Sequence, residues 1–139
     1  MEGLGVIARE RKTMSVVTDM ILVTAIDDGG GEDKHPNADR LNAWIREAHG
    51  PTEALKKVDQ HAGGNKAVQC DVFVGAINYL DEKGLIAAFR GVQWESPDCA
   101  QLMLKGEQKD RFTVYQLDHR GAVSMLNPDD AQAMRDEEL

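Results

Sequence analysis

The sequence predicts an α+β domain in which two helices cover one face of an antiparallel sheet of four to five strands. Apolar residues repeat at every second position in several short segments, as in half-buried strands, and at three- and four-residue spacing in two others, as in amphipathic helices. Glycine-rich and polar turns join neighbouring strand segments into hairpins, which requires antiparallel pairing. With 139 residues, the chain has room for one hydrophobic core and one domain.

The first predicted element is a strand over residues 20–26, where seven mostly apolar residues follow one another. Such a run is typical of a strand that is buried on both faces or lies at the centre of a sheet. The acidic, glycine-rich residues 27–34 come next, and since nothing apolar would fix them we expect a flexible, solvated loop. A calcium loop is not predicted, because Gly29 and Gly31 stand where oxygen ligands would be needed.

A helix is predicted to begin at His35-Pro36-Asn37, since proline suits the first helical turn and asparagine can cap it. Gly50 and Pro51 are expected to end this helix. Apolar residues at helical spacing form the stripe expected to face the sheet, namely Ala38, Leu41, Trp44, Ile45 and Ala48.

Residues 55–62 and 67–74 are predicted to pair as a hairpin around the glycine-rich turn at 63–66. The first segment alternates poorly and is the weaker strand. In the second segment, valine and cysteine occupy every other position, so this row is expected to face the core, with Cys70 as a buried thiol. The row consists of Val68, Cys70, Val72 and Val74.

A second helix is predicted over residues 82–92. Asp81 is its expected N-cap, and Leu80 and Leu85 hold the positions of a hydrophobic staple. The residues expected to form its buried stripe are Leu85, Ile86, Phe89 and Val92.

The last predicted hairpin joins residues 100–105 to residues 112–117 through a polar loop. Leucines alternate with Met103 in its first strand, and apolar residues alternate likewise in its second. We expect Met103 and Tyr115 to lie on the outward side of this hairpin, where with Leu117 they would form an apolar patch suited to a dimer or a partner protein.

The predicted order is strand, helix, strand, strand, helix, strand, strand, which is the split βαβ, or ferredoxin-like, order with one further strand at an edge. Residues 14–120 are expected to form the single α+β domain. Because Met14 and Ser15 look like an ordinary start, residues 1–13 are interpreted as an N-terminal extension. Residues 121–139 are expected to be a loosely held acidic tail with little to bury.

The net charge of the chain limits the classes of partner that it can bind. A net charge of -8 argues against nucleic acid and against an anionic membrane, since both attract clustered lysine and arginine. No segment has the length and apolarity of a membrane span or of a signal peptide. Cys70 and Cys99 form no CxxC motif and are expected to be free thiols in a reducing compartment, so we expect a cytoplasmic protein.

One polar cluster could carry chemistry. Asp59, His61, Asn65 and Lys66 bring a carboxylate, an imidazole, an amide and an amine into eight residues, and such groups can transfer protons or bind anions. The glycines between them do not follow the phosphate-loop pattern, and no nucleophile accompanies them. A polar approach to a hairpin turn is therefore the favoured interpretation.

No metal or cofactor is expected. The histidines and cysteines show no paired spacing of the kind that zinc sites use. Trp94, just after the second helix, is either a half-buried anchor for a partner or, as we favour, a residue that packs the helix end on the sheet.

These observations favour a small protein-binding or inhibitory accessory module of a bacterium or phage, and a non-enzymatic role. Its partner would be another protein or a second copy of itself in a homodimer. The alternative is an enzyme or small-ligand-binding protein with a site around His61, Asn65 and Lys66. A third possibility is a structural subunit of a larger assembly.

Overall fold

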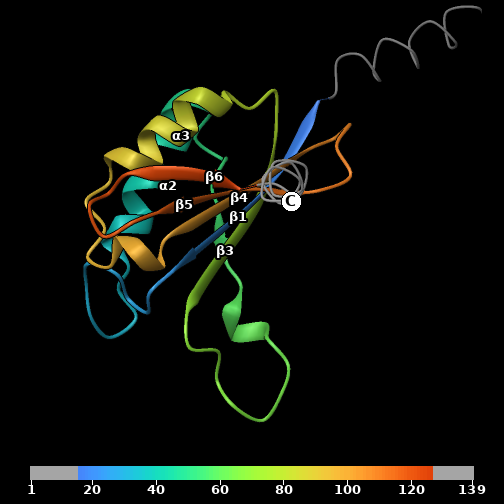
Figure 1. The fold of residues 1–139 in the computed structure, drawn as a ribbon. Helices are drawn as coiled ribbons and strands as arrows, with labels where there is room; N and C mark the ends of the chain where they lie inside the picture. The colour runs from blue at the N-terminus through green and yellow to red at the C-terminus, as the bar shows by residue number, and fades with distance from the viewer. Residues whose placement is uncertain (1–15, 127–139) are drawn as a thin grey trace, which may run out of the picture.

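The computed structural model describes residues 16–126 of the chain. They form an α+β fold with a six-stranded antiparallel sheet of order β2-β3-β1-β4-β5-β6 and two helices. Both helices lie on the same side of the sheet (Figure 1). The strands are β1 (Val17–Thr24), β2 (Lys56–Lys57), β3 (Asp71–Asn78), β4 (Gln101–Gly106), β5 (Thr113–Leu117) and β6 (Val123–Leu126); the helices are α2 (Pro36–His49) and α3 (Glu82–Gly91).

Strand β1 lies inside the sheet, as its apolar run predicts, and pairs with β3 on one side and β4 on the other. Met20 and Leu22 point to the helices and are 1 % and 0 % exposed. The strand starts and ends earlier than expected, and Ile26 beyond it is exposed. The helices and strands β1, β3, β4 and β5 enclose the hydrophobic core. Its largest fully buried members are Phe73, Phe89, Met20, Leu22, Leu41, Ile45, Leu85, Leu102 and Leu117.

Both helices are confirmed. Pro36 begins α2 as predicted, but its N-cap residue is His35, and Asn37 lies inside the helix and does not cap it. Helix α2 ends at Gly50, which has a φ of 123° and donates its N–H to Arg46 O over 2.9 Å. Helix α3 begins at Asp81, whose carboxylate accepts the Gly84 N–H at 3.0 Å. The expected stripe of α2 needs one correction, because Ala48 is exposed and Asn42 is buried.

Asn42 is buried because it joins α2 to the segment that leads into β2. Its side chain accepts the Leu55 N–H at 2.7 Å and donates to Leu55 O at 3.0 Å. A buried amide that satisfies both of its polar ends in this way need not weaken the core.

The face predicted for β3 is wrong. Phe73 and Ile77 point to the helices and are 2 % and 3 % exposed, whereas Val72 and Val74 lie on the opposite side of the sheet. Phenylalanine buries more apolar surface than valine, so the larger side chains take the covered side. Cys70 precedes the strand and is half-buried rather than part of the core.

The hairpin before β3 is also shorter than predicted. Strand β2 has two residues, after which the chain turns into the 3-10 helix η1 (Asp59–His61). The Asp59 carboxylate accepts the Val72 N–H at 2.9 Å, so a side chain takes a backbone donor that a continued strand would have used. Residues 62–69 form an exposed loop.

The sheet has six strands, more than the four to five expected, because β6 was missed. Strand β6 pairs with β5 after a tight turn in which Asp118 accepts the N–H groups of Arg120 and Ala122 at 2.8 and 3.0 Å. The sheet thus continues into the region expected to be a tail. The remainder of that tail, from residue 127, and the expected extension at 1–13 lie outside the described residues.

Candidate functional site

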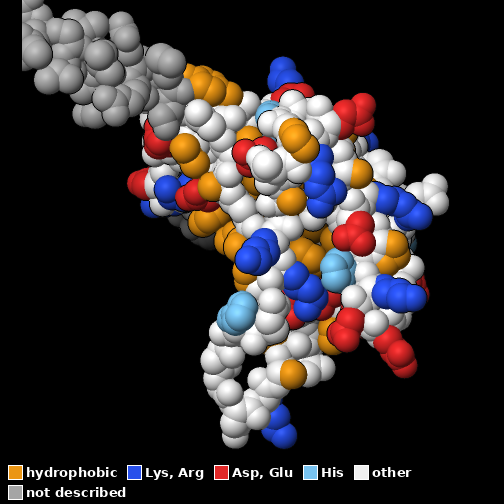
Figure 2. Space-filling model, turned by 180° about the vertical axis from the view of Figure 1, so that it is seen from behind, with side chains coloured by type: hydrophobic (Ala, Val, Ile, Leu, Met, Phe, Trp, Pro, Cys, Tyr) orange, Lys and Arg blue, Asp and Glu red, His pale blue; other side chains and the backbone are white. Residues whose placement is uncertain are grey.

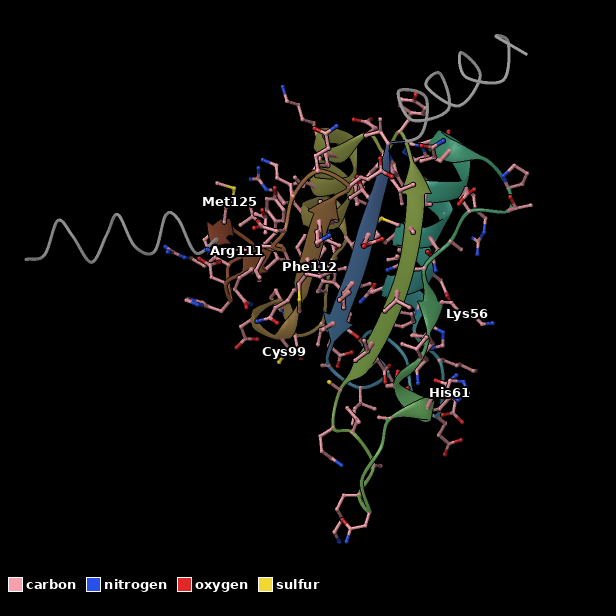
Figure 3. All side chains as sticks on the ribbon, turned by 90° about the vertical axis from the view of Figure 1, so that its right-hand side faces the viewer. Lys56, His61, Cys99, Arg111, Phe112 and Met125 are labelled. Carbon is pink, nitrogen blue, oxygen red and sulfur yellow. The ribbon has the colours of Figure 1, made fainter. Side chains whose placement is uncertain are left out.

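The side of the sheet turned away from α2 and α3 is here called the open face. It presents the β-strand residues that alternate with the core residues, and its apolar centre consists of Ile21, Val23, Val72, Val74, Met103 and Val114. Figure 3 looks onto this side, and neither helix lies in front of β1 and β3. Within residues 16–126, the helix layer is confined to the other side of the sheet (Figure 1).

Strand register places four of these apolar side chains in one continuous row. Ile21 lies opposite Val74 on β3 and opposite Met103 on β4, and Met103 lies opposite Val114 on β5. Directly opposed side chains in an antiparallel sheet are about 5 Å apart at Cβ. The row therefore crosses four neighbouring strands without a polar interruption.

Opposite charges occupy the next row of the open face. Asp19 on β1 lies directly opposite Lys105 on β4. No ion pair joins these two side chains or links either of them to another residue in the described range 16–126. With Lys56, which lies opposite Val74 at the edge of the sheet, the strands present one acid and two bases on this side. The whole chain, by contrast, carries a net charge of -8.

The predicted polar cluster divides into two parts, and Asp59 belongs to the structural part. Its carboxylate accepts from Lys57 Nζ at 2.8 Å, and the same Nζ lies 3.7 Å from the buried carboxylate of Asp71. Burial alone would raise the pKa of Asp59, but the hydrogen bonds from Lys57 and from Val72 N outweigh it and hold the pKa below its ordinary value. The hydrogen bond to Asp59, opposed by burial and aided by Asp71, raises the pKa of Lys57.

The other three residues of the cluster, His61, Asn65 and Lys66, are exposed. His61 ends η1, and Asn65 and Lys66 lie on the loop that follows it; this segment projects from the lower end of the molecule in Figures 1 and 2. His61 points away from the sheet in Figure 3. Hollows of about 430, 350 and 500 Å³ occur elsewhere on the described surface and are lined by other residues. The structure therefore does not gather this cluster into a site.

Trp94 packs in the core, as the favoured interpretation predicted. It is 6 % exposed, its indole N–H donates to Phe89 O at 2.9 Å, and the two rings lie 5.7 Å apart. Its burial supports the packing role and not that of a half-buried anchor for a partner.

The patch predicted from Met103 and Tyr115 is wrong, because the two residues lie on opposite faces. Tyr115 pairs with the core residue Leu102 and packs against the core, and burial, aided by the charge of Glu82, raises its pKa. Leu117, the third predicted member, is 2 % exposed in the core. Met103 alone reaches the open face, where Ile21 is one of its neighbours.

A buried polar junction was missed at the end of β1. Asp28 is 3 % exposed and accepts three hydrogen bonds: from Asn37 Nδ2 at 2.6 Å, from Glu95 N at 2.9 Å and from Ser96 N at 3.0 Å. It thereby ties the loop after β1 to α2 and to the segment before β4, so the expectation that nothing fixes this loop is wrong. No sequence signal separated Asp28 from its acidic neighbours.

Both carboxylate oxygens of Asp28 already accept hydrogen bonds within the protein, so they are poorly placed to bind a ligand. Among residues 16–126, no group of three or more histidine, cysteine, aspartate or glutamate side chains is placed to hold a metal ion. Neither helix in this range is long and apolar enough to cross a membrane.

Since the predicted polar cluster is not gathered into a site and the described residues offer no metal site, the open face is the strongest candidate for a functional surface.

Comparison of the chain with known protein families, with curated proteins and with solved structures finds no match.

Proposed function

We propose that this protein is a protein-binding module whose docking surface is the open face of its sheet. The observation that carries the proposal is the uninterrupted apolar row of Val74, Ile21, Met103 and Val114, which no described helix covers. Contiguous apolar surface on a folded protein is typical of interaction sites, because removing it from water is favourable by about 25 cal/mol per Å² before the costs of association.

The charge distribution supports a protein as the partner. Most of the acidic residues lie off the open face, where they keep the chain soluble and repel nucleic acid. The open face itself is nearly neutral and can be desolvated at modest cost. The accessory or inhibitory role expected from the sequence, in the cytoplasm of a bacterium or phage-infected cell, remains part of this proposal.

We also infer that residues 17–106 form a split βαβ unit of ferredoxin-like order, to which β5 and β6 are added. Two observations support this inference: β1 lies between β3 and β4, and one helix follows β1 and one follows β3. In such a unit both helices lie on one side, which leaves the other side of the sheet available for binding.

The enzymatic alternative has less support. It needs His61, Asn65 and Lys66 to enclose a substrate, and all three are exposed at the end of η1 and on the projecting loop after it. An active site ordinarily excludes water from the reacting groups.

Site-specific photo-crosslinking in the producing cell tests the proposal. A benzophenone amino acid at Met103 on the open face is expected to give covalent protein adducts. The same amino acid at Met125, a 55 % exposed methionine that pairs with Tyr115 on the other side of the sheet, is expected to give none. Absence of adducts from position 103, or equal adducts from both positions, would contradict the proposal.

A second variant checks that the adducts depend on the open face as a whole. The benzophenone residue is placed at Val74, and Met103→Glu or Met125→Glu is added to the same chain. Only Met103→Glu should abolish the adduct, since a buried glutamate without a partner opposes docking.

A further inference from the structure

We propose that the occupant of the open face is a second copy of this chain, bound about a two-fold axis that runs along the strands between β1 and β4. The inference rests on the proposed function, because it assumes that the open face is the docking surface. It adds the identity of the partner and the geometry of the complex.

The order of the strands provides the first argument. Three strands lie on each side of the boundary between β1 and β4. A rotation by 180° about an axis along that boundary lays β1 on β4 of the second copy, β3 on β5 and β2 on β6. Every strand therefore has a counterpart, as an isologous interface between identical chains requires.

The charged row provides the second argument. Because Asp19 and Lys105 lie directly opposite each other across this boundary, the rotation stacks Asp19 of each copy on Lys105 of the other. A two-fold axis along the strands between β1 and β3 would instead stack Asp19 on Ala76 of the other copy. A two-fold axis that crosses the strands at Ile21 would stack Asp19 on Val23 of the other copy. Among these alternatives, only the axis between β1 and β4 pairs the two charges.

The remaining rows are compatible with the same axis. Ile21 stacks on Met103 and Val74 on Val114, so apolar side chains meet in the central row. In the following row the rotation stacks Val23 on Gln101 and Val72 on Gln116. The Gln101 amide N–H donates to Gln116 Oε1, and Gln116 donates to Leu117 O at 2.9 Å, so these amide N–H groups keep acceptors when the valines cover them.

The size of the surface fits a reversible dimer. A face about 25 Å wide and 20 Å long follows from the usual strand spacing and rise per residue, and two such faces bury roughly 1,000 Å² in total. That total is at the low end for specific interfaces. When two sheets pack face to face, their strand directions usually differ by about 30°. The long side chain of Lys105, next to the axis, can still reach Asp19 of the other copy at that angle.

The test is the oligomeric state of the full chain by analytical ultracentrifugation over about a hundredfold range of concentration. The wild-type chain should dimerise as its concentration rises. Asp19→Lys and Lys105→Asp should each weaken the dimer at least about tenfold, since like charges then face each other at both contacts. An equal mixture of the two variants should restore it, because the mixed dimer carries opposite charges at both contacts.

Circular dichroism spectra equal to that of the wild type would show that these surface variants fold. Met103→Glu should abolish the dimer, and Met125→Glu on the other side of the sheet should leave it intact. Loss of the dimer with Met125→Glu alone would overturn the proposal in favour of pairing through the β6 edge. A dimer that the mixture fails to restore would overturn the proposed axis.

A chain that stays monomeric at every concentration would overturn the second copy as occupant. In that case adducts between position 103 and a different protein would leave the proposed function standing. Absence of both the dimer and the adducts would overturn both proposals.

Discussion

The two faces of this sheet are both apolar, yet the helices within residues 16–126 cover only one of them. Leu22 and Leu102 point to the helices and are 0 % exposed, whereas their sequence neighbours Ile21 and Met103 remain half-buried on the open face. Apolarity therefore does not decide which face becomes the core. The helices cover the side with leucine and phenylalanine, whereas the other side presents valine, isoleucine and one methionine.

The largest expected difference between the two faces is in stability. Leu102→Ala should lower the free energy of unfolding by about 3 kcal/mol, because it leaves a cavity in a packed core. Met103→Ala, one residue along, should cost less than about 1 kcal/mol, since its side chain retains contact with water. Urea denaturation at low protein concentration measures both values. Equal losses would mean that the open face is covered in the single chain.

The helix side also depends on a polar junction, which the open face lacks. Asp28→Ala should cost about 2–3 kcal/mol, because three hydrogen-bond donors lose their acceptor in a buried place. Asp39→Ala is the matched control, since this side chain is 68 % exposed near the same end of α2, and its effect should stay within about 0.5 kcal/mol. Thermal or urea unfolding of the two variants provides the comparison.

The ion pair between Lys57 and Asp59 predicts how stability varies with pH. The folded-state pKa of Asp59 is below its ordinary 3.8, so its contribution is complete above that pH and is lost as the pH falls through the folded-state value. The pKa of Lys57 is raised above 10.5, so its contribution is complete below that pH and is lost as the pH rises through the folded-state value.

Asp59→Asn tests the acid limb of this dependence. The variant should be less stable than the wild type by about 1 kcal/mol near neutral pH, the size of one hydrogen bond, and the difference should shrink in acid. Unfolding curves across a pH series measure it. A difference that grew as the pH fell would contradict the assigned direction of the Asp59 pKa.

The smallest effect is expected for the loop that belongs to neither face. Deletion of residues 62–68 should change the free energy of unfolding by less than about 0.6 kcal/mol, because these side chains are exposed and loop length affects closure entropy only weakly. The deletion should also leave the proposed dimer unchanged. A loss of dimer or a large loss of stability would assign this loop a role in the open face.

The helices could be predicted from the sequence because their signals are local. The spacing of Leu41 and Ile45, the cap at Asp81 and the end at Gly50 all lie within the helix concerned or next to it. The number of strands could not be predicted in the same way, since β6 has four residues and is defined by its pairing with β5.

The candidate surface was predicted only in part, for a similar reason. Met103 was expected to face outward, and it does, but its neighbours Ile21, Val74 and Val114 come from three other strands. Their proximity depends on strand order and register, which the alternation within one segment does not determine. Tyr115 was misplaced because alternation alone does not determine which side of a strand faces the helices.

The position of β1 also affects how the chain folds. Strand β1 ends at Thr24, whereas the two strands that pair with it, Asp71–Asn78 and Gln101–Gly106, come much later in the sequence. During synthesis, the most apolar segment of the protein thus emerges long before either hydrogen-bonding partner exists. Folding that depends on such distant pairing is slow, and the waiting segment is prone to aggregate. The yield of native protein should therefore respond to chaperones that shield short apolar segments.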